Sequence, residues 1–140
     1  MLMKRLVALA VLIALLSGCA QLENAKLHAA YVDVSVEEAH RLIEEHRGDS
    51  SFVILDVRGS EDFKKEHIAG AINLDVFDRG FEEKLKRMDT NKTYLVYCKT
   101  GFRSKIAAGI MAKMGFRHVY NMAGGIEAWK SMGYPVEKTG

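Results

Sequence analysis

The segment Tyr97-Cys98-Lys99-Thr100-Gly101-Phe102-Arg103-Ser104 joins two runs of different periodicity. The run before it, residues 93–97, is β-branched and aromatic, which is typical of a buried strand. After it, apolar residues recur at helical spacing as far as Met114, and Gly115 is placed to end the helix. The sequence therefore predicts that a strand, a tight loop and a helix meet at one cysteine.

This junction predicts an anion site with Cys98 at its floor. The N–H groups of the loop and the positive end of the helix would point into one small cup, and Gly101 would let the backbone curl. Helix N-termini and adjacent cations, here Lys99 and Arg103, lower a cysteine pKa from about 8.5 to roughly 3.5–7.5. We therefore expect a nucleophilic thiolate. The alternative is a structural cysteine, because free cysteines are among the most buried residues.

The length of the loop separates two kinds of thiolate chemistry. Four residues lie between Cys98 and Arg103, whereas phosphatases with a similar loop have five. Cys-x4-Arg-Ser after a strand resembles the active-site loop of the rhodaneses, which are sulfurtransferases. The resemblance implies a cradle for a sulfur atom carried on Cys98 as a persulfide. The expected substrate-binding residues are Lys99, Thr100, Gly101, Phe102, Arg103 and Ser104, with Lys99 and Arg103 holding an anionic donor and Phe102 walling the pocket.

Other segments resemble the same family in order, from about Tyr31 to Val136. They are Leu55-Asp56-Val57-Arg58, His67-Ile68-Ala69-Gly70-Ala71-Ile72-Asn73 and Gly124-Gly125-Ile126-Glu127-Ala128-Trp129. Glu66 and Ala69 depart from the usual Gly and Pro. We expect the glycine pair to let the backbone pass close to the cysteine loop, and Trp129 to pack in the core.

Two polar positions near the expected site have structural alternatives. Asp56 and Arg58 follow a buried apolar run, where open α/β sheets place ligands, so they are candidate supporting residues. A structural ion pair with Glu61, Asp62 or Glu66 is the reading we favour. His67 could serve as a general base, but a turn residue bonded to the backbone is favoured.

Strand and helix patterns alternate through the chain. Strand patterns cover residues 31–34, 52–55, 71–74, 93–97 and 115–120. Four helical patterns lie between or after them: one begins at a capping box at Ser35, one runs from Phe81 to Met88, one follows the cysteine and one lies near the end of the chain. This order predicts an α/β fold, a rhodanese-like domain with a mostly parallel five-stranded sheet and helices on both faces.

The N-terminal residues resemble a targeting signal. Lys4 and Arg5 precede eleven apolar or small residues, Leu6–Leu16, which span roughly 16 Å and are short for a 30 Å hydrocarbon core. Ser17-Gly18-Cys19 then resembles a bacterial lipobox with lipidation at Cys19. We predict a signal peptide over 1–18, a tether over 19–30 and one domain over 31–137, located in the cell envelope outside the cytoplasm. An uncleaved signal anchor is the alternative.

Charge and cysteine usage limit the possible partners. The 140 residues carry a net charge of +2, for which Lys4 and Arg5 account, so no nucleic-acid partner is indicated. The chain has two cysteines; a disulfide between Cys19 and Cys98 would consume the reactive thiol and is disfavoured. Neither a metal site nor a cofactor is expected, because one cysteine and scattered histidines lack ligand spacing.

These patterns predict an exported, membrane-anchored sulfurtransferase. Sulfane sulfur would pass from a donor such as thiosulfate, through Cys98, to cyanide or a thiol acceptor such as a thioredoxin-like protein. The alternative is a persulfide carrier or redox-sensing module for a partner protein, with little turnover of small molecules. Phosphatase or arsenate reductase chemistry is disfavoured by the four-residue spacing.

Overall fold

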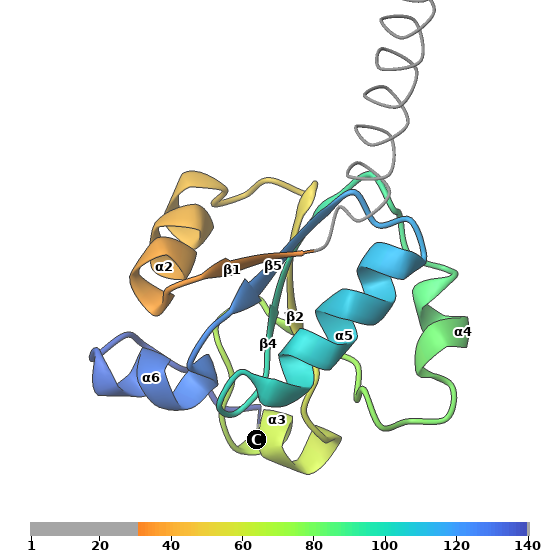
Figure 1. Cartoon of the computed structure of the whole chain (residues 1–140). Coiled ribbons are helices and arrows are strands. Elements are labelled where there is room, and N and C mark those ends of the chain that lie inside the picture. The colour runs from red at the N-terminus through yellow and green to blue at the C-terminus, as the bar shows by residue number, and fades with distance from the viewer. Residues whose placement is uncertain (1–30, 140) are drawn as a thin grey trace, which may run out of the picture.

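The computed structural model describes residues 31–139, which form a sheet covered by helices on both faces (Figure 1). The predicted signal peptide, the tether and the lipidation site at Cys19 lie outside these residues. Within the described part of the chain, no helix is both long and apolar enough to cross a membrane.

The sheet is parallel throughout. Its strands are β1 (Val32–Val34), β2 (Phe52–Asp56), β3 (Ile72–Asn73), β4 (Thr93–Tyr97) and β5 (His118–Met122). They lie in the order β1-β5-β4-β2-β3, and every neighbouring pair is parallel. The predicted α/β fold with five strands is therefore confirmed, and β1 is the edge strand that its alternating pattern indicated.

Two helices cover each face of the sheet. The helices are α2 (Val36–Glu45), α3 (Ser60–Lys65), α4 (Phe81–Leu85), α5 (Phe102–Lys113) and α6 (Gly125–Ser131). Residues of α2 and α6 share one hydrophobic cluster, and residues of α4 and α5 share the other. The sequence analysis did not predict α3, which buries no residue and follows the carboxyl end of β2 (Figure 1).

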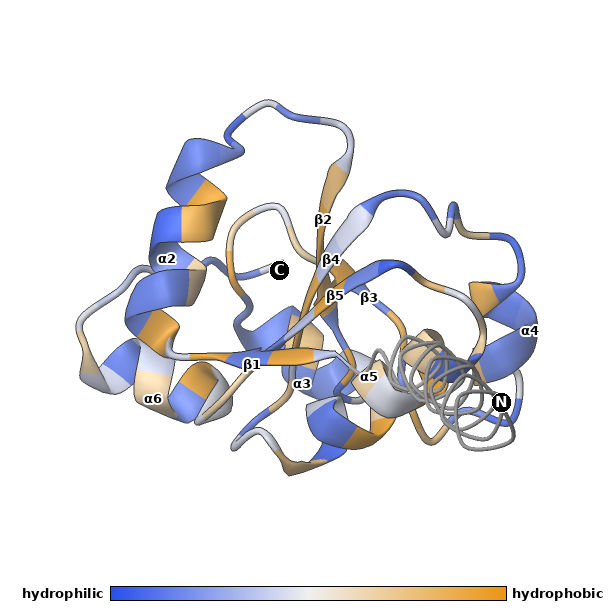
Figure 2. Ribbon diagram, turned by 45° about the horizontal axis from the view of Figure 1, so that its top comes forward, coloured by the Kyte–Doolittle hydropathy of each residue, from blue (hydrophilic) through white to orange (hydrophobic). Residues whose placement is uncertain are grey.

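The central strands are apolar on both faces because both faces are covered. Figure 2 shows a run of hydrophobic residues along β2, which has helices on both faces of its sheet. Side chains of a strand alternate in direction, so Leu95 and Tyr97 belong to the cluster under α2 and α6, whereas Val96 and Cys98 belong to the cluster under α4 and α5. The cysteine side chain therefore projects toward the face that α4 and α5 cover.

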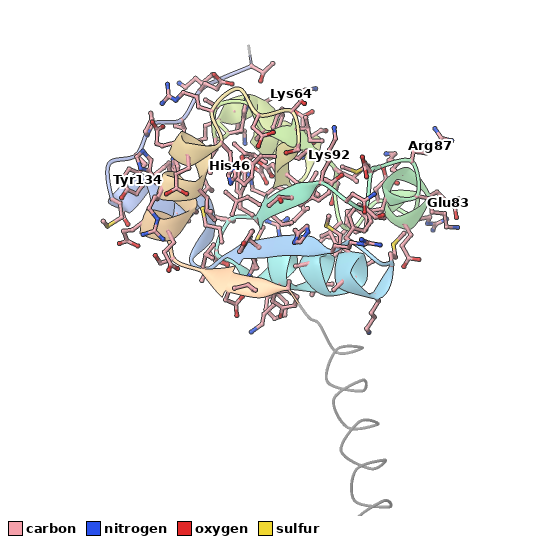
Figure 3. All side chains as sticks on the ribbon, turned by 90° about the horizontal axis from the view of Figure 1, so that it is seen from above. His46, Lys64, Glu83, Arg87, Lys92 and Tyr134 are labelled. Atoms are coloured by element: carbon pink, nitrogen blue, oxygen red, sulfur yellow. The ribbon has the colours of Figure 1, made fainter. Side chains whose placement is uncertain are left out.

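The first long helix begins as the sequence predicts. The Ser35 hydroxyl accepts a hydrogen bond from the Glu38 amide at 3.2 Å, and the Glu38 carboxylate accepts one from the Ser35 amide at 3.1 Å. This reciprocal pair is a capping box, which satisfies two otherwise unpaired donors. On the other side of the molecule, Glu83 and Arg87 project away from the fold (Figure 3).

Two predicted boundaries were wrong. Helix α4 ends at Leu85 rather than Met88, because the Met88 amide bonds the Leu85 carbonyl in a tight turn. Strand β5 begins at His118 rather than Gly115, because residues 115–117 close the preceding helix: the Phe116 amide bonds the Met111 carbonyl at 3.1 Å.

Candidate active site

The Cys98 thiol lies directly after β4, the middle strand of the sheet, and is surrounded by hydrogen-bonding groups. The residue is only 1% exposed. The Gly101 amide donates to Cys98 Sγ at 3.1 Å, and the Ser104 hydroxyl oxygen lies 3.4 Å from the sulfur. The amides of Thr100 and Ser104 also act on the sulfur, and both lower the pKa of the thiol. The loop therefore surrounds one sulfur atom with main-chain donors, as its sequence predicted.

Left-handed backbone at Gly101 produces this curl. Its φ is 101°, a value that favours glycine, and α5 begins at the next residue. A Cβ at Gly101 would lie 3.0 Å from the Gly124 amide nitrogen. Both the turn and the close approach of the second chain segment therefore require glycine here.

The N-terminus of α6 braces the same loop from behind. The Ile126 amide donates to the Cys98 carbonyl at 2.9 Å, and the Glu127 amide donates to the Lys99 carbonyl at 3.1 Å. The first N–H groups of a helix have no partner within the helix, so the loop carbonyls satisfy them. A Cβ on Gly125 would overlap the Lys99 carbonyl group and lie 2.6 Å from the Cys98 oxygen. The predicted close passage of the glycine pair is confirmed.

These contacts lower the pKa of the Cys98 thiol below its ordinary value. Burial is the largest single influence and raises the pKa, but it is outweighed by hydrogen bonds from the Ser104 hydroxyl and from the amides of Ser104, Gly101 and Thr100. Lys99 and Arg103, to which the sequence analysis partly assigned the shift, are not among its largest causes. Hydrogen bonding therefore stabilises the thiolate here.

The residues expected to bind substrate lie in different environments. Lys99 and Thr100 are exposed, and Phe102 is 72% exposed at the start of α5. Arg103 is half-buried, with its guanidinium carbon 5.9 Å from the centre of the Phe77 ring. Ser104 is fully buried beside the sulfur, so it acts on the thiol and has no access to the surface.

Phe77 is a neighbour of the site that sequence reasoning missed. It lies in the connection between β3 and α4 and is 68% exposed. A single aromatic residue in a connecting segment has no periodicity, so no local signal places it near the cysteine loop. Its contact with Arg103 depends entirely on the tertiary fold.

Asp56 and Arg58 form a buried pair with each other. The Arg58 side chain donates to both carboxylate oxygens of Asp56 at 2.7–3.1 Å, and the two side chains are 0% and 6% exposed. Arg58 also donates to the Glu66 carbonyl at 2.6 Å. The favoured structural reading therefore fits the geometry, but the expected acidic partners Glu61, Asp62 and Glu66 were wrong. Burial opposes the Arg58 charge, yet the Asp56 hydrogen bond and charge leave the pKa of Arg58 raised.

His67 forms an isolated antiparallel bridge with Glu137 rather than a turn, and its ring bonds to the backbone. Its Nδ1 lies 2.8 Å from the Phe63 carbonyl oxygen, and its Nε2 lies 3.2 Å from a Glu137 carboxylate oxygen. The residue is 4% exposed and its ring stacks on Phe63. Both ring nitrogens thus have structural contacts, which matches the favoured backbone-bonded reading.

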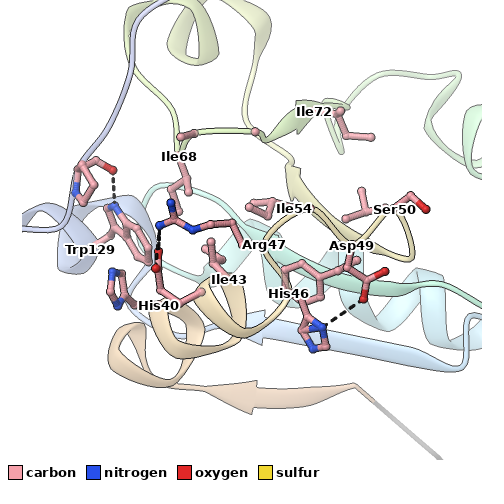
Figure 4. A pocket seen from close by; sticks show the side chains of 17 residues that line it. His40, Ile43, His46, Arg47, Asp49, Ser50, Ile54, Ile68, Ile72 and Trp129 are labelled. Atoms are coloured by element: carbon pink, nitrogen blue, oxygen red, sulfur yellow. Dashed lines mark hydrogen bonds and ion pairs between the residues drawn. The ribbon is translucent and has the colours of Figure 1, made fainter.

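Two pockets lie near the sheet but neither contains Cys98. One of about 630 Å³ lies between α2 and the segment around Ile68, with Ile43, Ile54 and Trp129 in its lining (Figure 4). The other, of about 200 Å³, is polar and includes Lys99, Arg58 and Lys65. Lys99 therefore lines a cleft of mixed charge, which also contains the carboxylates of Asp62, Glu66 and Glu127. Among residues 31–139, no three His, Cys, Asp or Glu side chains are grouped as a metal site.

Comparison with known proteins places this loop in a family. The model of the rhodanese-like domain matches residues 35–132. The thiosulfate sulfurtransferase GlpE of Coxiella burnetii is 35% identical over 101 residues, which are 72% of this chain and 89% of that protein. A putative sulfur carrier protein, YrkF of Bacillus subtilis, is 35% identical over 81 residues, which are 58% of this chain and 43% of that protein.

Solved structures agree with this assignment. The rhodanese-like domain of the Anabaena protein Alr3790 superposes with a TM-score of 0.65 at 26% identity, covering 76% of this chain and 78% of that one. A structure described as rhodanese with anions from E. coli gives a TM-score of 0.51 at 36% identity, covering 62% of this chain and 98% of that one. The family model and the relatives cover most of the described residues, and on that basis the chain belongs to the rhodanese-like domain family.

Proposed function

We propose that the chain is a sulfurtransferase that moves sulfane sulfur from a donor such as thiosulfate to a thiol or to cyanide through a persulfide on Cys98. The observation that carries this proposal is the 3.1 Å hydrogen bond from the Gly101 amide to the Cys98 sulfur, beside the Ser104 hydroxyl at 3.4 Å. The sulfurtransferase names of relatives at 30–35% identity support it.

The first step is a displacement at sulfur. The Cys98 thiolate attacks the outer sulfur of thiosulfate, the S–S bond of the donor breaks, and sulfite leaves with the bonding electron pair. The product is a Cys98 persulfide. In the second step an acceptor thiolate or cyanide attacks the outer sulfur, and the Cys98 thiolate is the leaving group. No external oxidant or reductant is needed, because the sulfur atom moves without net electron loss.

The loop favours the negative charge on Cys98, both as the thiolate and as the persulfide. Main-chain donors that point at a position where negative charge resides stabilise it without reorganisation, as in an oxyanion hole. The Ser104 hydroxyl lies within hydrogen-bonding distance of both the Cys98 sulfur, at 3.4 Å, and the Gly101 carbonyl oxygen, at 3.1 Å. Its single proton can turn to the sulfur when the thiol ionises, because hydroxyl rotors adapt to their acceptors.

Arg103 and Lys99 supply the positive charge that an anionic donor requires. The planar guanidinium of Arg103 suits a bidentate contact with sulfonate oxygens, whereas Lys99 acts as a point charge. Arg103 remains half-buried with its ring contact to Phe77, which limits the orientations of the guanidinium. We assign donor binding to these two side chains.

A carrier role is a second candidate, and the match to a putative sulfur carrier protein favours it. A carrier would use the same residues but deliver its sulfur to one protein. The two functions differ in rate: a carrier forms the Cys98 persulfide yet turns over small donors and acceptors negligibly.

We further propose that the chain acts in the cell envelope, anchored by lipid on Cys19. The support is the order of Lys4-Arg5, an apolar run of eleven residues and Ser17-Gly18-Cys19. Covalent acyl chains would hold the domain at a membrane surface. The intact mass of the chain purified from its own cell tests this proposal, because a lipidated Cys19 adds a defined mass and loses the preceding residues.

Mass spectrometry and kinetics test the sulfur chemistry together. After incubation with thiosulfate, we expect the intact chain to gain about 32 Da, the mass of one sulfur atom, and the added mass to be lost on exposure to cyanide. Cys98→Ser should show neither the gain nor any thiosulfate-dependent formation of thiocyanate. Full turnover by Cys98→Ser would refute the covalent route, and Cys98-dependent hydrolysis of an aryl phosphate would favour phosphatase chemistry instead.

A further inference from the structure

Three exposed apolar side chains gather beside the cysteine loop. Phe77, Phe102 and Ile106 are 68%, 72% and 42% exposed, although side chains of this size are usually buried. Phe102 and Ile106 are one helical turn apart on α5, so they lie on the same side of that helix. Phe77 reaches the same region through Arg103, whose side chain contacts its ring. We call these three residues the apolar rim.

The apolar rim belongs to the end of the fold where sulfur leaves the protein. Phe102 is the first residue of α5, directly after the loop that holds the Cys98 sulfur. The helix that follows Gly101 turns its own buried side chains, such as Ala107 and Met111, toward the sheet. The rim therefore lies on the exposed side of this part of α5 and is not part of the core.

An apolar rim adds little to the binding of cyanide or of a small thiol. Exposed aromatic side chains are favourable at protein interfaces, where burial removes them from water and aromatic residues and Arg are enriched. The sulfur itself is nearly inaccessible, because Cys98 is 1% exposed. An acceptor must consequently be placed close above the loop, and a partner that covers the rim would be placed there.

The charged side chains of the cysteine loop and the start of α5 are positive, whereas Phe77 lies between Asp75 and Asp78, of which Asp78 pairs with Lys84. Lys99, Arg103 and Lys105 lie within or next to the loop, and the first turn of α5 contains no acidic residue. Arg79 follows Phe77 by two residues and is exposed. None of these four cations forms an ion pair with another residue of the described chain. A partner with acidic residues around its thiol would match these charges, and charge complementarity speeds association.

We infer that the apolar rim and its cations are the docking surface for a protein acceptor whose reactive cysteine lies in an apolar patch bordered by acidic residues. This inference rests on the proposed function, since it identifies the acceptor class for the Cys98 persulfide. In the transfer, the thiolate of the partner attacks the outer sulfur of the persulfide. The Cys98–S bond breaks, the partner becomes the persulfide and the Cys98 thiolate is released.

Transfer from preformed Cys98 persulfide to two acceptors tests the inference. The protein probe is reduced thioredoxin, and the small probe is 2-mercaptoethanol. For each variant the measured quantity is the second-order rate constant for thioredoxin divided by that for 2-mercaptoethanol. We expect Phe77→Ser combined with Ile106→Ser to lower this ratio by about tenfold or more. Met132→Ser is the matched control, because Met132 is 48% exposed and follows α6 on the other face.

Ionic strength tests the charged part of the surface. Transfer to thioredoxin should slow as salt rises, and Lys105→Ser should weaken this dependence, because exposed charges are screened. A ratio unchanged by the double substitution, or changed equally by Met132→Ser, would overturn the inference, as would transfer to thioredoxin that is no faster than transfer to the small thiol. Failure to form any persulfide on Cys98 would instead refute the proposed function itself.

Discussion

Gly125→Ala is expected to destabilise the domain by about 3 kcal/mol or more. The substitution places a Cβ against the Lys99 carbonyl group and 2.6 Å from the Cys98 oxygen, and the residue has a φ of +62° that disfavours any side chain. The neighbouring atoms are backbone, so they cannot move aside without displacing the cysteine loop. Thermal unfolding followed by circular dichroism should show a midpoint lower by roughly 10–20 °C.

Gly133→Ala is the control that separates the effect of atomic overlap from the effect of left-handed backbone. Gly133 has a φ of +77°, but a Cβ there would meet no atom within 4 Å. We expect this control to cost only about 1–2 kcal/mol, the cost of left-handed backbone alone. Equal losses of stability for Gly125→Ala and Gly133→Ala would show that α6 does not brace the loop as described.

Asp56→Asn is expected to cost roughly 3–5 kcal/mol, because it leaves the Arg58 charge buried without an anion. The pair is 0% and 6% exposed, and Arg58 donates to both oxygens of Asp56. Asparagine keeps the shape of the side chain, so the loss measures charge rather than packing. Urea unfolding monitored by the fluorescence of Trp129 gives the free energy of unfolding.

The exposed pair of Glu44 and Arg47 provides the comparison. Its closest atoms are 2.5 Å apart, shorter than those of the buried pair, but its side chains are 44% and 75% exposed. Glu44→Gln should therefore change the free energy of unfolding far less than Asp56→Asn does, because exposed ion pairs contribute little. If Glu44→Gln and Asp56→Asn cost the same, burial would not be the reason for the effect of Asp56.

The sequence was most informative where local patterns determine structure. The Ser35 capping box, the buried run in β2 and the strand–loop–helix around Cys98 all follow from residue types within a few positions. The close approach of Gly124 and Gly125 to the cysteine loop could also be predicted, because such an approach of two backbones excludes every other residue.

Contacts that the tertiary fold selects among several candidates could not be predicted in this way. The partner of Arg58 depends on which neighbouring carboxylate the fold buries with it, and a strand end offered several acidic candidates. Phe77 meets Arg103 only because the β3–α4 connection folds over the loop. Ser104 was expected to bind substrate, whereas the first turn of α5 buries it against the sulfur. The spacing between Cys98 and Ser104 is compatible both with substrate binding and with a contact to the sulfur.

The lowered pKa of Cys98 also links the site to stability. A thiol that ionises more readily in the folded state than in the unfolded chain stabilises the fold at high pH. This contribution is fully present above the unfolded value of about 8.5, and it is lost as the pH falls through the folded value. Cys98→Ser removes the contribution, so the difference in unfolding free energy between it and the wild type should depend on pH.

The most direct test of the account is the titration of Cys98 in the intact chain. Carbon NMR of cysteine-labelled protein follows its Cβ signal against pH, with Cys98→Ser assigning the resonance. We predict a midpoint below about 8.5, and a higher midpoint in Ser104→Ala, because that variant loses the hydroxyl beside the sulfur. A wild-type midpoint at or above the ordinary value, unchanged in Ser104→Ala, would show that the loop does not hold Cys98 as a thiolate.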